Sequence, residues 1–435
     1  MPFNHRRSFW IFLTGVVFLA VSFVGIYCSR KTERDRRSTG HLTQRQPRVF
    51  MLDPQLLSAS KEKIQSGDAS VGPAFKKLQS EADKTLKAGP FSVVFKKPLP
   101  PSGNKHDYMS MAPYWWPDPD TPDGLPYIRR DGETNPERDQ YDRLPFWDME
   151  SAVSTLALAY YFTGHGPYAA HASKLIRTWF LDEATYMNPH LNYGEAIKGI
   201  CEGRAAGIIE TRPLFRIADA VGLIAGSESW TEQDQEKLES WYGRYLKWLI
   251  QSEIGKSEAE KENNHGTWYE VQVSAIALFL NKTDVAGDVL QKIPKRISSQ
   301  IEPDGSQPLE LERTRAFHYS SMNVEGLFDA ATLGEKVGLD IWHFKTEDGR
   351  SVRRALGFLT AFAVGEKPWP YPMIRGWEQD RELIAVLLRQ ASIKYQEPEY
   401  NRLIGKLPGV DTLSGRFQLL YPYTTPSGAG NENRK

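Results

Sequence analysis

The chain has 435 residues, of which 40% are hydrophobic and 25% charged, an ordinary composition for a globular protein with one large or several small domains. Its 54 basic and 54 acidic residues cancel, which excludes the global positive field that draws in nucleic acid. Two cysteines, Cys28 and Cys201, cannot form a disulfide framework, and no Cys-x-x-Cys spacing predicts zinc. We therefore expect no cofactor.

The N-terminus has the pattern of a targeting element. Arg6 and Arg7 precede an uncharged run, residues 9–28, that is long enough to cross a bilayer. A bulky Tyr27 before Cys28 fits a lipoprotein signal poorly. We expect residues 1–28 to be a signal or an anchor, the only part that contacts a membrane, with the body of the protein periplasmic or secreted.

The rest of the chain reads as one helical domain. We expect residues 29–50 to be a disordered linker because they are polar and rich in Arg, and residues 426–435 to be a disordered tail. Between them, residues 51–89 show helical periodicity, with Asp53 or Ser58 as the cap. Further helices are predicted at 146–162, 168–181, 203–223, 232–251, 268–280, 285–299, 322–337, 352–364 and 377–393, with a short strand within 417–425.

Successive helices joined by short turns predict helices that pair in antiparallel fashion. Closing such pairs into a ring gives an all-α fold, an incomplete α/α toroid over residues 51–425, whose long irregular loops frame a cleft. No internal repeat supports the ring independently, so the toroid is an inference from the order of the helices.

One long stretch, residues 105–143, has no helical period and is rich in Pro, Asp, Gly and aromatic residues. Asp118, Asp120 and Asp123 suggest calcium, but the prolines between them spoil EF-hand geometry, so turn formation is the favoured interpretation. The aromatic residues form either a wall that stacks sugar rings or a small core of the loop itself. They are Tyr108, Tyr114, Trp115 and Trp116.

Two further stretches combine residues suited to a site for a carboxylate. Asn263, Asn264 and His265 stand directly before an apolar run, where an amide and an imidazole either bind a carboxylate or simply cap the helix. About fifty residues on, Arg313 and Tyr319 supply a guanidinium and a phenol. An i, i+6 pair points about 120° apart on an α-helix, so these two side chains share a cleft only if a bend or a helix end lies between them.

Taken in order, these motifs resemble the alginate lyase superfamily of helical-toroid polysaccharide lyases, nearer to polysaccharide lyase family 38 than to family 5. The likeness spans about residues 100–380. It rests on His-Asp-Tyr-Met-Ser-Met-Ala-Pro-Tyr-Trp-Trp-Pro-Asp-Pro, Asn-Pro-His-Leu-Asn-Tyr-Gly, Gly-Arg, Asn-Asn-His-Gly-Thr-Trp-Tyr and Arg-x-Arg-x-x-His-Tyr.

The resemblance implies roles for single residues. Its catalytic set maps onto Asn264, His265, Arg313 and Tyr319. The spacing departs from family 5, where Arg and Tyr lie seven apart, so Arg315 is an alternative to Arg313. For substrate binding we expect Tyr108, Tyr114, Trp115, Asn192, Arg204, Arg315 and His318; His318 alternatively fills the core, and Arg204 alternatively forms an ion pair at a helix end.

The same residue types fit β-elimination from a uronic-acid polymer. Removal of the C5 proton builds negative charge on the uronate carboxylate, which Asn264, His265 and Arg313 would neutralise. Tyr319 would take the C5 proton and return a proton to O4. D-mannuronate and D-glucuronate carry both groups on one ring face, so we expect polymannuronate or glucuronan as substrate. L-guluronate would need His265 as a separate base.

Two other functions remain open at this stage. A glycoside hydrolase on the same fold would use two carboxylates across a cleft, with candidates in Asp107, Glu195, Glu310 and Glu312. A non-catalytic protein that binds acidic polysaccharide would keep the aromatic residues and Arg204 but would tolerate loss of Tyr319. Neither the oligomeric state nor endo or exo action follows from the sequence.

Overall fold

The computed structural model describes residues 46–377 and 379–423. Every named helix and strand lies within the compact unit that begins at Pro47. The expected signal or anchor, most of the expected linker and the expected tail lie outside the described residues. Among the helices that are described, none is both long and apolar enough to cross a membrane.

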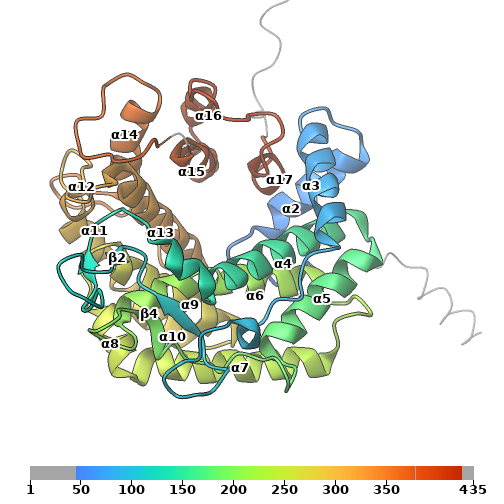
Figure 1. The fold of residues 1–435 in the computed structure, drawn as a ribbon. Coiled ribbons are helices and arrows are strands. Elements are labelled where there is room, and N and C mark those ends of the chain that lie inside the picture. Colours follow the sequence, from blue (N-terminus) through green and yellow to red (C-terminus); the bar gives the residue numbers. More distant parts are fainter. Residues whose placement is uncertain (1–45, 378, 424–435) are drawn as a thin grey trace, which may run out of the picture. The chain divides into compact units, whose positions relative to one another are not determined.

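The inner helices of this unit pack side by side in chain order (Figure 1). They are α4 (Arg143–Thr163), α6 (Leu214–Ile224), α9 (Asn264–Phe279), α13 (Ala316–Lys336) and α15 (Asp380–Lys394). A second layer covers them: α5 (Gly166–Phe180) packs on α4, α7 (Glu232–Gln251) and α10 (Thr283–Leu290) pack on α9, and α14 (Val352–Ala363) packs on α13. This is the predicted α/α toroid.

Helix α9 lies at the centre of this arrangement. Every residue of it is buried except His265. A helix that is buried all round must be covered on every side. Helix α9 is covered by α6, α7, α8 (Glu253–Ala259), α10 and α13. The one polar side chain that α9 partly exposes is therefore held on a rigid element, which is what a site of fixed geometry requires.

The remaining helices are short or lie at the ends of the unit. They are α2 (Pro54–Gln65), α3 (Gly72–Thr85), α8 (Glu253–Ala259), α11 (Ile293–Gln300), α12 (Pro308–Leu311), α16 (Glu399–Ile404), α17 (Phe417–Leu420) and the 3₁₀ turns η1 (Val93–Phe95), η2 (Pro136–Gln140) and η3 (Ala205–Thr211). Asp53 caps α2 through its side chain, as expected, by accepting from the backbone N–H groups of Gln55 and Leu56.

Three predicted elements differ from those observed in number or type, besides shifts of helix ends. The helix expected over 203–223 is split into η3 and α6, because Pro213 cannot continue a hydrogen-bonded turn. The helix expected over 285–299 is split into α10 and α11, with a proline in the first turn of α11. The strand expected within 417–425 is wrong: its first residues form α17, which packs on α2 and α3.

Two small sheets fix the long loop of residues 105–143. Strand β1 (Met109–Met111) pairs in parallel with β4 (Tyr193–Ala196), and β2 (Trp115–Trp116) pairs antiparallel with β3 (Ile128–Arg129). The first pair brings the aromatic loop beside Glu195 and Arg204, and the second folds the loop back on itself. The loop therefore has a defined conformation in spite of its lack of helical period.

Candidate active site

The aromatic loop and helix α13 meet at two phenols. The hydroxyl oxygens of Tyr114 and Tyr319 lie 2.6 Å apart, so the two groups share one hydrogen bond. Tyr319 is in the first turn of α13 and only 7% of it is exposed. Burial and the neighbouring Tyr114 raise the pKa of Tyr319, and the Arg313 cation opposes the shift. The resting Tyr319 is accordingly a neutral phenol that holds its proton.

Arg313 lies directly against this phenol. Its guanidinium carbon is 3.8 Å from the centre of the Tyr319 ring, a cation–π contact. Helix α13 begins at Ala316, so a helix end separates the two residues, which is the condition that their spacing of six required. Arg313 and Tyr319 therefore do share a site.

The position of Arg313 is set by Asp131 from the aromatic loop. The carboxylate of Asp131 accepts from Nε and Nη2 of Arg313 at 3.2 and 2.8 Å, and also from the backbone N–H and hydroxyl of Thr314. Burial alone would raise the pKa of Asp131, but the guanidinium and the Thr314 hydrogen bonds hold it well below its usual range. Asp131 occupies Nε and one N–H of Nη2, so Nη1 and the second N–H of Nη2 are what Arg313 can offer to a ligand.

His265 is held by a carboxylate that the sequence did not single out. Its Nδ1 lies 2.6 Å from Oε1 of Glu258, so Nδ1 carries a proton and Nε2 is left for a ligand. Burial alone would lower the pKa of His265, but Glu258, Glu195 and Glu310 together raise it. His265 can thus donate from Nε2 as an imidazolium, or accept a proton there when it is neutral.

Asn264 is placed differently from the expectation. It is fully buried, and its backbone N–H and side-chain Nδ2 both donate to Glu310, at 2.7 and 2.6 Å. Its Oδ1 is buried and makes no hydrogen bond with any described residue. In this arrangement a uronate carboxylate does not reach the Asn264 amide. Asn264 instead ties the first turn of α9 to Glu310, three residues before Arg313, and so joins the two stretches that the sequence singled out.

A second charged pair, Glu195 and Arg204, lies near His265. Glu195 has a left-handed backbone, with φ of 48°, which non-glycine residues rarely adopt outside functional or constrained sites. Its carboxylate accepts from Nη2 of Arg204 at 2.5 Å, while Nε of Arg204 is buried without a described partner. Of the two readings of Arg204, the ion pair is the one observed.

The structure also places the other expected substrate-binding residues. Tyr108 is fully buried and donates to Glu210, so its ring has no face open to a sugar, and the expectation for it fails. Trp115 packs on the small core of the loop. Asn192 is exposed and accepts from the Trp248 indole. Arg315 pairs through its backbone with Met373, and His318 is hydrogen-bonded to Asp380 at 2.8 Å.

Four charged residues of the site were not predicted from the sequence. Asp131 and Glu258 hold Arg313 and His265. Arg138 lies close enough to Tyr114 for the phenol to affect the pKa of its guanidinium, which burial lowers. Arg143 lies near Arg138, 3.5 Å from Glu210. Asp131 pairs with a residue 182 positions away, which leaves no local signal, whereas Glu258 lies only seven positions before His265.

The three acids of the loop form turns, as predicted. Asp118 accepts from the backbone N–H of Asp120, and Asp123 from that of Leu125. Among the described residues no group of three or more His, Cys, Asp or Glu side chains is arranged to hold a metal ion.

The four carboxylates considered for a hydrolase are not arranged as a pair across a cleft. Glu310 is bonded to Asn264 and Glu195 to Arg204, while Asp107 accepts from Asn188 and lies 3.1 Å from His190. Glu312 is exposed. Each of the three buried acids already serves a neighbour.

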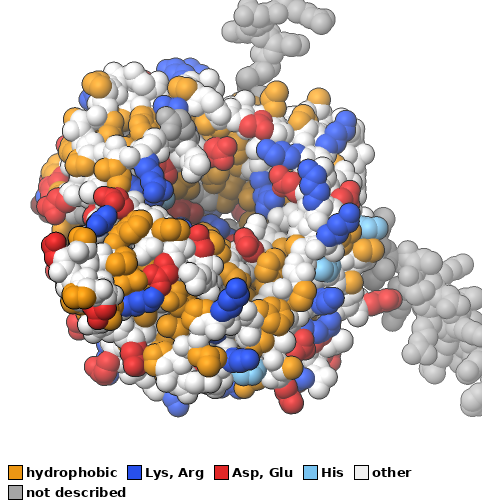
Figure 2. Space-filling model, viewed as in Figure 1, with side chains coloured by type: hydrophobic (Ala, Val, Ile, Leu, Met, Phe, Trp, Pro, Cys, Tyr) orange, Lys and Arg blue, Asp and Glu red, His pale blue; other side chains and the backbone are white. Residues whose placement is uncertain are grey.

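The face shown in Figure 2 is hollowed between the α13–α15 side and the α4–α17 side, and Lys, Arg, Asp and Glu side chains lie around the hollow. A cavity of about 330 Å³ lies between these helices. Its polar lining includes Glu150, Arg216, Glu325, Asp329 and Tyr421. Glu325 follows Tyr319 by six residues on α13, a rise of about 9 Å, so this part of the cavity lining lies farther along α13 than the phenols.

Comparison with known proteins places this geometry in a family. The model of the alginate lyase family matches residues 92–369. Among solved structures, an alginate lyase from Bacteroides ovatus is 39% identical, with a TM-score of 0.82 over 86% of this chain and 99% of that one. None of the curated proteins matches the sequence.

More distant structures share the fold alone. Alginate lyase A1-III from Sphingomonas species A1 is 17% identical, with a TM-score of 0.55 over 86% of this chain and 95% of that one. A histidine-to-alanine variant of alginate lyase A1-III, complexed with a tetrasaccharide, is 15% identical, with a TM-score of 0.56 over 88% and 98%.

Proposed function

The chain belongs to the alginate lyase family and is a polysaccharide lyase, and from this premise we propose that it cleaves alginate, with polymannuronate preferred, or glucuronan. The reaction is β-elimination, which leaves a 4,5-unsaturated uronate at the new chain end. The observation that carries the proposal is the phenol of Tyr319, bonded to the Tyr114 hydroxyl and covered by the Arg313 guanidinium.

These contacts suit a phenol that moves a proton. As a base, Tyr319 must first lose its own proton, and the resulting phenolate would be stabilised by the Tyr114 O–H and by the Arg313 cation. After it has taken the C5 proton, the neutral phenol can donate to the O4 leaving group. One side chain then serves as base and acid, which requires H5 and O4 on the same face of the sugar.

Neutralisation of the uronate carboxylate falls to two donors. Nη1 and the second N–H of Nη2 of Arg313, together with Nε2 of His265, are the groups that remain after Asp131 and Glu258 have taken theirs. Charge that develops on the carboxylate in the transition state strengthens both hydrogen bonds, which is where such donors contribute most to rate. Asn264 acts by holding the start of α9 through Glu310.

The base changes with the substrate. On guluronate, H5 and O4 lie on opposite faces, so Tyr319 could serve as the acid while neutral His265 accepts the proton at Nε2. Glu258 would keep the other ring nitrogen protonated and so orient Nε2 toward the sugar. Polymannuronate is preferred in this account because Tyr319 alone completes the reaction.

The cellular location of the enzyme is part of the same proposal. An alginate or glucuronan chain is too large to enter a cell intact, which supports a periplasmic or secreted enzyme held or exported through residues 9–28.

Incubation of the purified protein with polymannuronate, polyguluronate, glucuronan and hyaluronan tests the proposal. The ultraviolet absorbance of the new C4–C5 double bond distinguishes elimination from hydrolysis, which creates none. We expect the fastest rise in absorbance on polymannuronate or glucuronan. Cleavage of these polymers without the absorbance, or of polyguluronate alone, would contradict the proposed substrate and base.

A further inference from the structure

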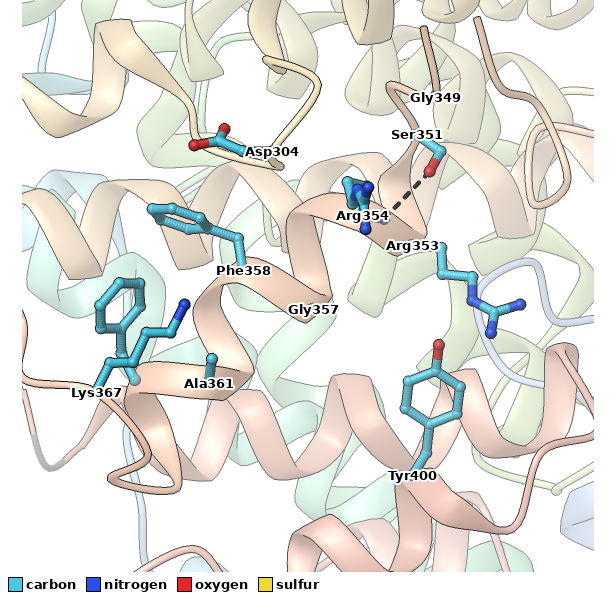
Figure 3. A pocket seen from close by; sticks show the side chains of 11 residues that line it. Asp304, Gly349, Ser351, Arg353, Arg354, Gly357, Phe358, Ala361, Lys367 and Tyr400 are labelled. Atoms are coloured by element: carbon cyan, nitrogen blue, oxygen red, sulfur yellow. Dashed lines mark hydrogen bonds between the residues drawn. The ribbon is translucent and has the colours of Figure 1, made fainter. Parts of the chain in front are cut away.

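A groove of about 600 Å³ runs along helix α14, and neither Tyr114 nor Tyr319 lines it (Figure 3). Its floor is Gly357 and Ala361, with Phe358 and Lys367 on one side of Gly357 and Arg353 and Tyr400 on the other. The groove thus combines cationic side chains with aromatic rings, the two kinds of group that bind acidic sugars.

The cations of the groove have exposed side chains and partners that a polyanion could replace. Arg354 donates from Nε to the carbonyl of Pro303. The Arg354 guanidinium also lies close enough to Asp304 to help lower the pKa of that carboxyl, and Lys367 is exposed. Arg353 pairs with Glu397, but both side chains are about half exposed, at 50% and 42%, so this pair contributes little. Asp304 is the single acid in the lining.

Gly357 points to a ligand independently of charge. A glycine inside a helix costs about 1 kcal/mol relative to alanine. Here a Cβ at Gly357 would meet nothing within 4 Å, so the protein itself does not require the glycine. What the glycine does is to keep the floor of the groove low enough for another molecule to approach the helix.

A row of aromatic rings connects the groove to the catalytic helix. Phe362 lies 5.0 Å from Trp369, and Trp369 lies 5.0 Å from Phe317, which is two residues before Tyr319. The chain then continues to Met373, whose backbone pairs with Arg315. Lys367 and Met373 are six residues apart, a span of at most about 22 Å, so one polymer chain could reach both places.

We infer that the groove on α14 is a second binding site for the acidic polysaccharide, which holds a long chain while another part of it reacts at Tyr319. This inference rests on the proposed function for the identity of the polymer. The site retains long substrates and makes no difference to short ones, because an oligosaccharide that fills the reacting centre does not extend to the groove.

Two kinds of variant separate binding in the groove from folding. Arg354→Glu combined with Lys367→Glu reverses its charge. Gly357→Gln fills it without a change of charge, and should leave the helix at least as stable because glutamine is the better helix former. Lys76→Glu combined with Lys237→Glu, exposed positions on α3 and α7, changes the net charge equally and is the control for the double variant.

Kinetics on long polymannuronate and on its tetrasaccharide decide the matter. We expect both groove variants to raise KM for the polymer about tenfold, with kcat and the tetrasaccharide kinetics unchanged and the control close to the wild type. Equal behaviour of groove and control variants would overturn the inference, as would an equal loss on the tetrasaccharide or a change in sedimentation that marks the groove as a contact between copies of the chain.

Binding measured without cleavage distinguishes a failure of the second site from a failure of the proposed function. In a Tyr319→Phe background, affinity electrophoresis in gels that contain polymannuronate reports retention without cleavage, and the difference between the groove variants and the control is the contribution of the groove. If the wild type cleaves no uronan, the proposed function fails. If it cleaves polymannuronate but the groove variants are retained as strongly as the control, only the second site fails.

Discussion

Tyr114 is the residue whose role changed most between sequence and structure. Its hydroxyl bonds to that of Tyr319, so it belongs to the proposed reacting centre and not to an outer wall for stacking sugars. Tyr108, from the same loop, was expected to bind substrate but is buried in the core. Residue type and spacing do not distinguish these two positions, because both tyrosines lie in an irregular segment whose partners come from distant helices.

Replacement of Tyr114 by Phe should slow the chemical step. Loss of the hydroxyl removes a donor that stabilises the Tyr319 phenolate, so we expect kcat on polymannuronate to fall by about 10²-fold. The rising limb of kcat/KM against pH should also move to higher pH. Tyr127→Phe, in the same loop, is the control because its hydroxyl bonds to Glu137. Equal activity of the two variants would remove Tyr114 from the mechanism.

The pair of Glu258 and His265 predicts a second pH effect. The Glu258 carboxylate contributes to raising the pKa of His265, whereas burial lowers it. In Glu258→Gln the pKa of His265 should therefore fall, and the imidazolium should be lost at lower pH than in the wild type. On polymannuronate, where the imidazolium donates to the carboxylate, the falling limb of kcat/KM should shift to lower pH.

On polyguluronate the same variant should behave differently, because the neutral imidazole would be the base. Its activity there should extend to lower pH, provided that this polymer is cleaved at all. A falling limb on polymannuronate that stays at the pH of the wild type would show that His265 does not supply the titrating group.

At the scale of elements, the site depends on how the aromatic loop docks on the start of α13. Asp131 and Gly132 make this contact, and the charge of Asp131 persists into acid because its pKa is depressed. The stabilisation from Asp131 is present above its pKa in the unfolded chain and is lost as the pH falls through its folded pKa. The loop should therefore stay docked except in strong acid.

Gly132→Ala tests the docking. Gly132 and Gly338 share a φ of +76°, so alanine strains the backbone equally at both. Only at Gly132 would the new Cβ clash, 2.4 Å from Oγ1 of Thr314 and 2.7 Å from Cδ1 of Ile374. We expect Gly132→Ala to lower kcat by at least about tenfold, since Tyr114 and Asp131 move with the loop, and Gly338→Ala to leave it unchanged. Similar kcat values for both variants would contradict this docking.

The sequence predicted the elements better than their ends. Helix α7 was placed at both its bounds, and Asp53 was foreseen as a cap, because periodicity and capping are local signals. The start of α9 was placed four residues late, at Trp268 in place of Asn264, since Asn264 and His265 carry no apolar periodicity. That error matters for function, because the first turn of α9 orients His265.

At the scale of the whole domain, the ring of helices was predictable from the sequence. The packing of residues 48–52 against α6 and α9 was not. The end of the expected linker is ordered: Phe50, Met51 and Leu52 donate backbone hydrogen bonds to the buried carboxylate of Asp219 on α6. Arg48 also donates to the carbonyl groups of Leu278 and Phe279, at the end of α9. Pairings between residues so far apart in the chain leave no local signal.

Asp219→Ala should therefore destabilise the domain without a direct effect on the chemistry. It leaves three backbone N–H groups without their acceptor, and we expect the free energy of unfolding in urea to fall by about 3 kcal/mol. Asp219→Asn keeps one acceptor oxygen and should lose less. Similar unfolding curves for Asp219→Ala and the wild type would show that residues 50–52 contribute little to the stability of the ring.

The central claim, that Tyr319 moves the proton in a β-elimination, is tested most directly by Tyr319→Phe. The wild type should produce the absorbance of the 4,5-unsaturated uronate from polymannuronate or glucuronan, and the variant should produce none while its circular dichroism and its retention by the polymer stay unchanged. Near-normal formation of the double bond by a folded Tyr319→Phe protein would contradict the mechanism.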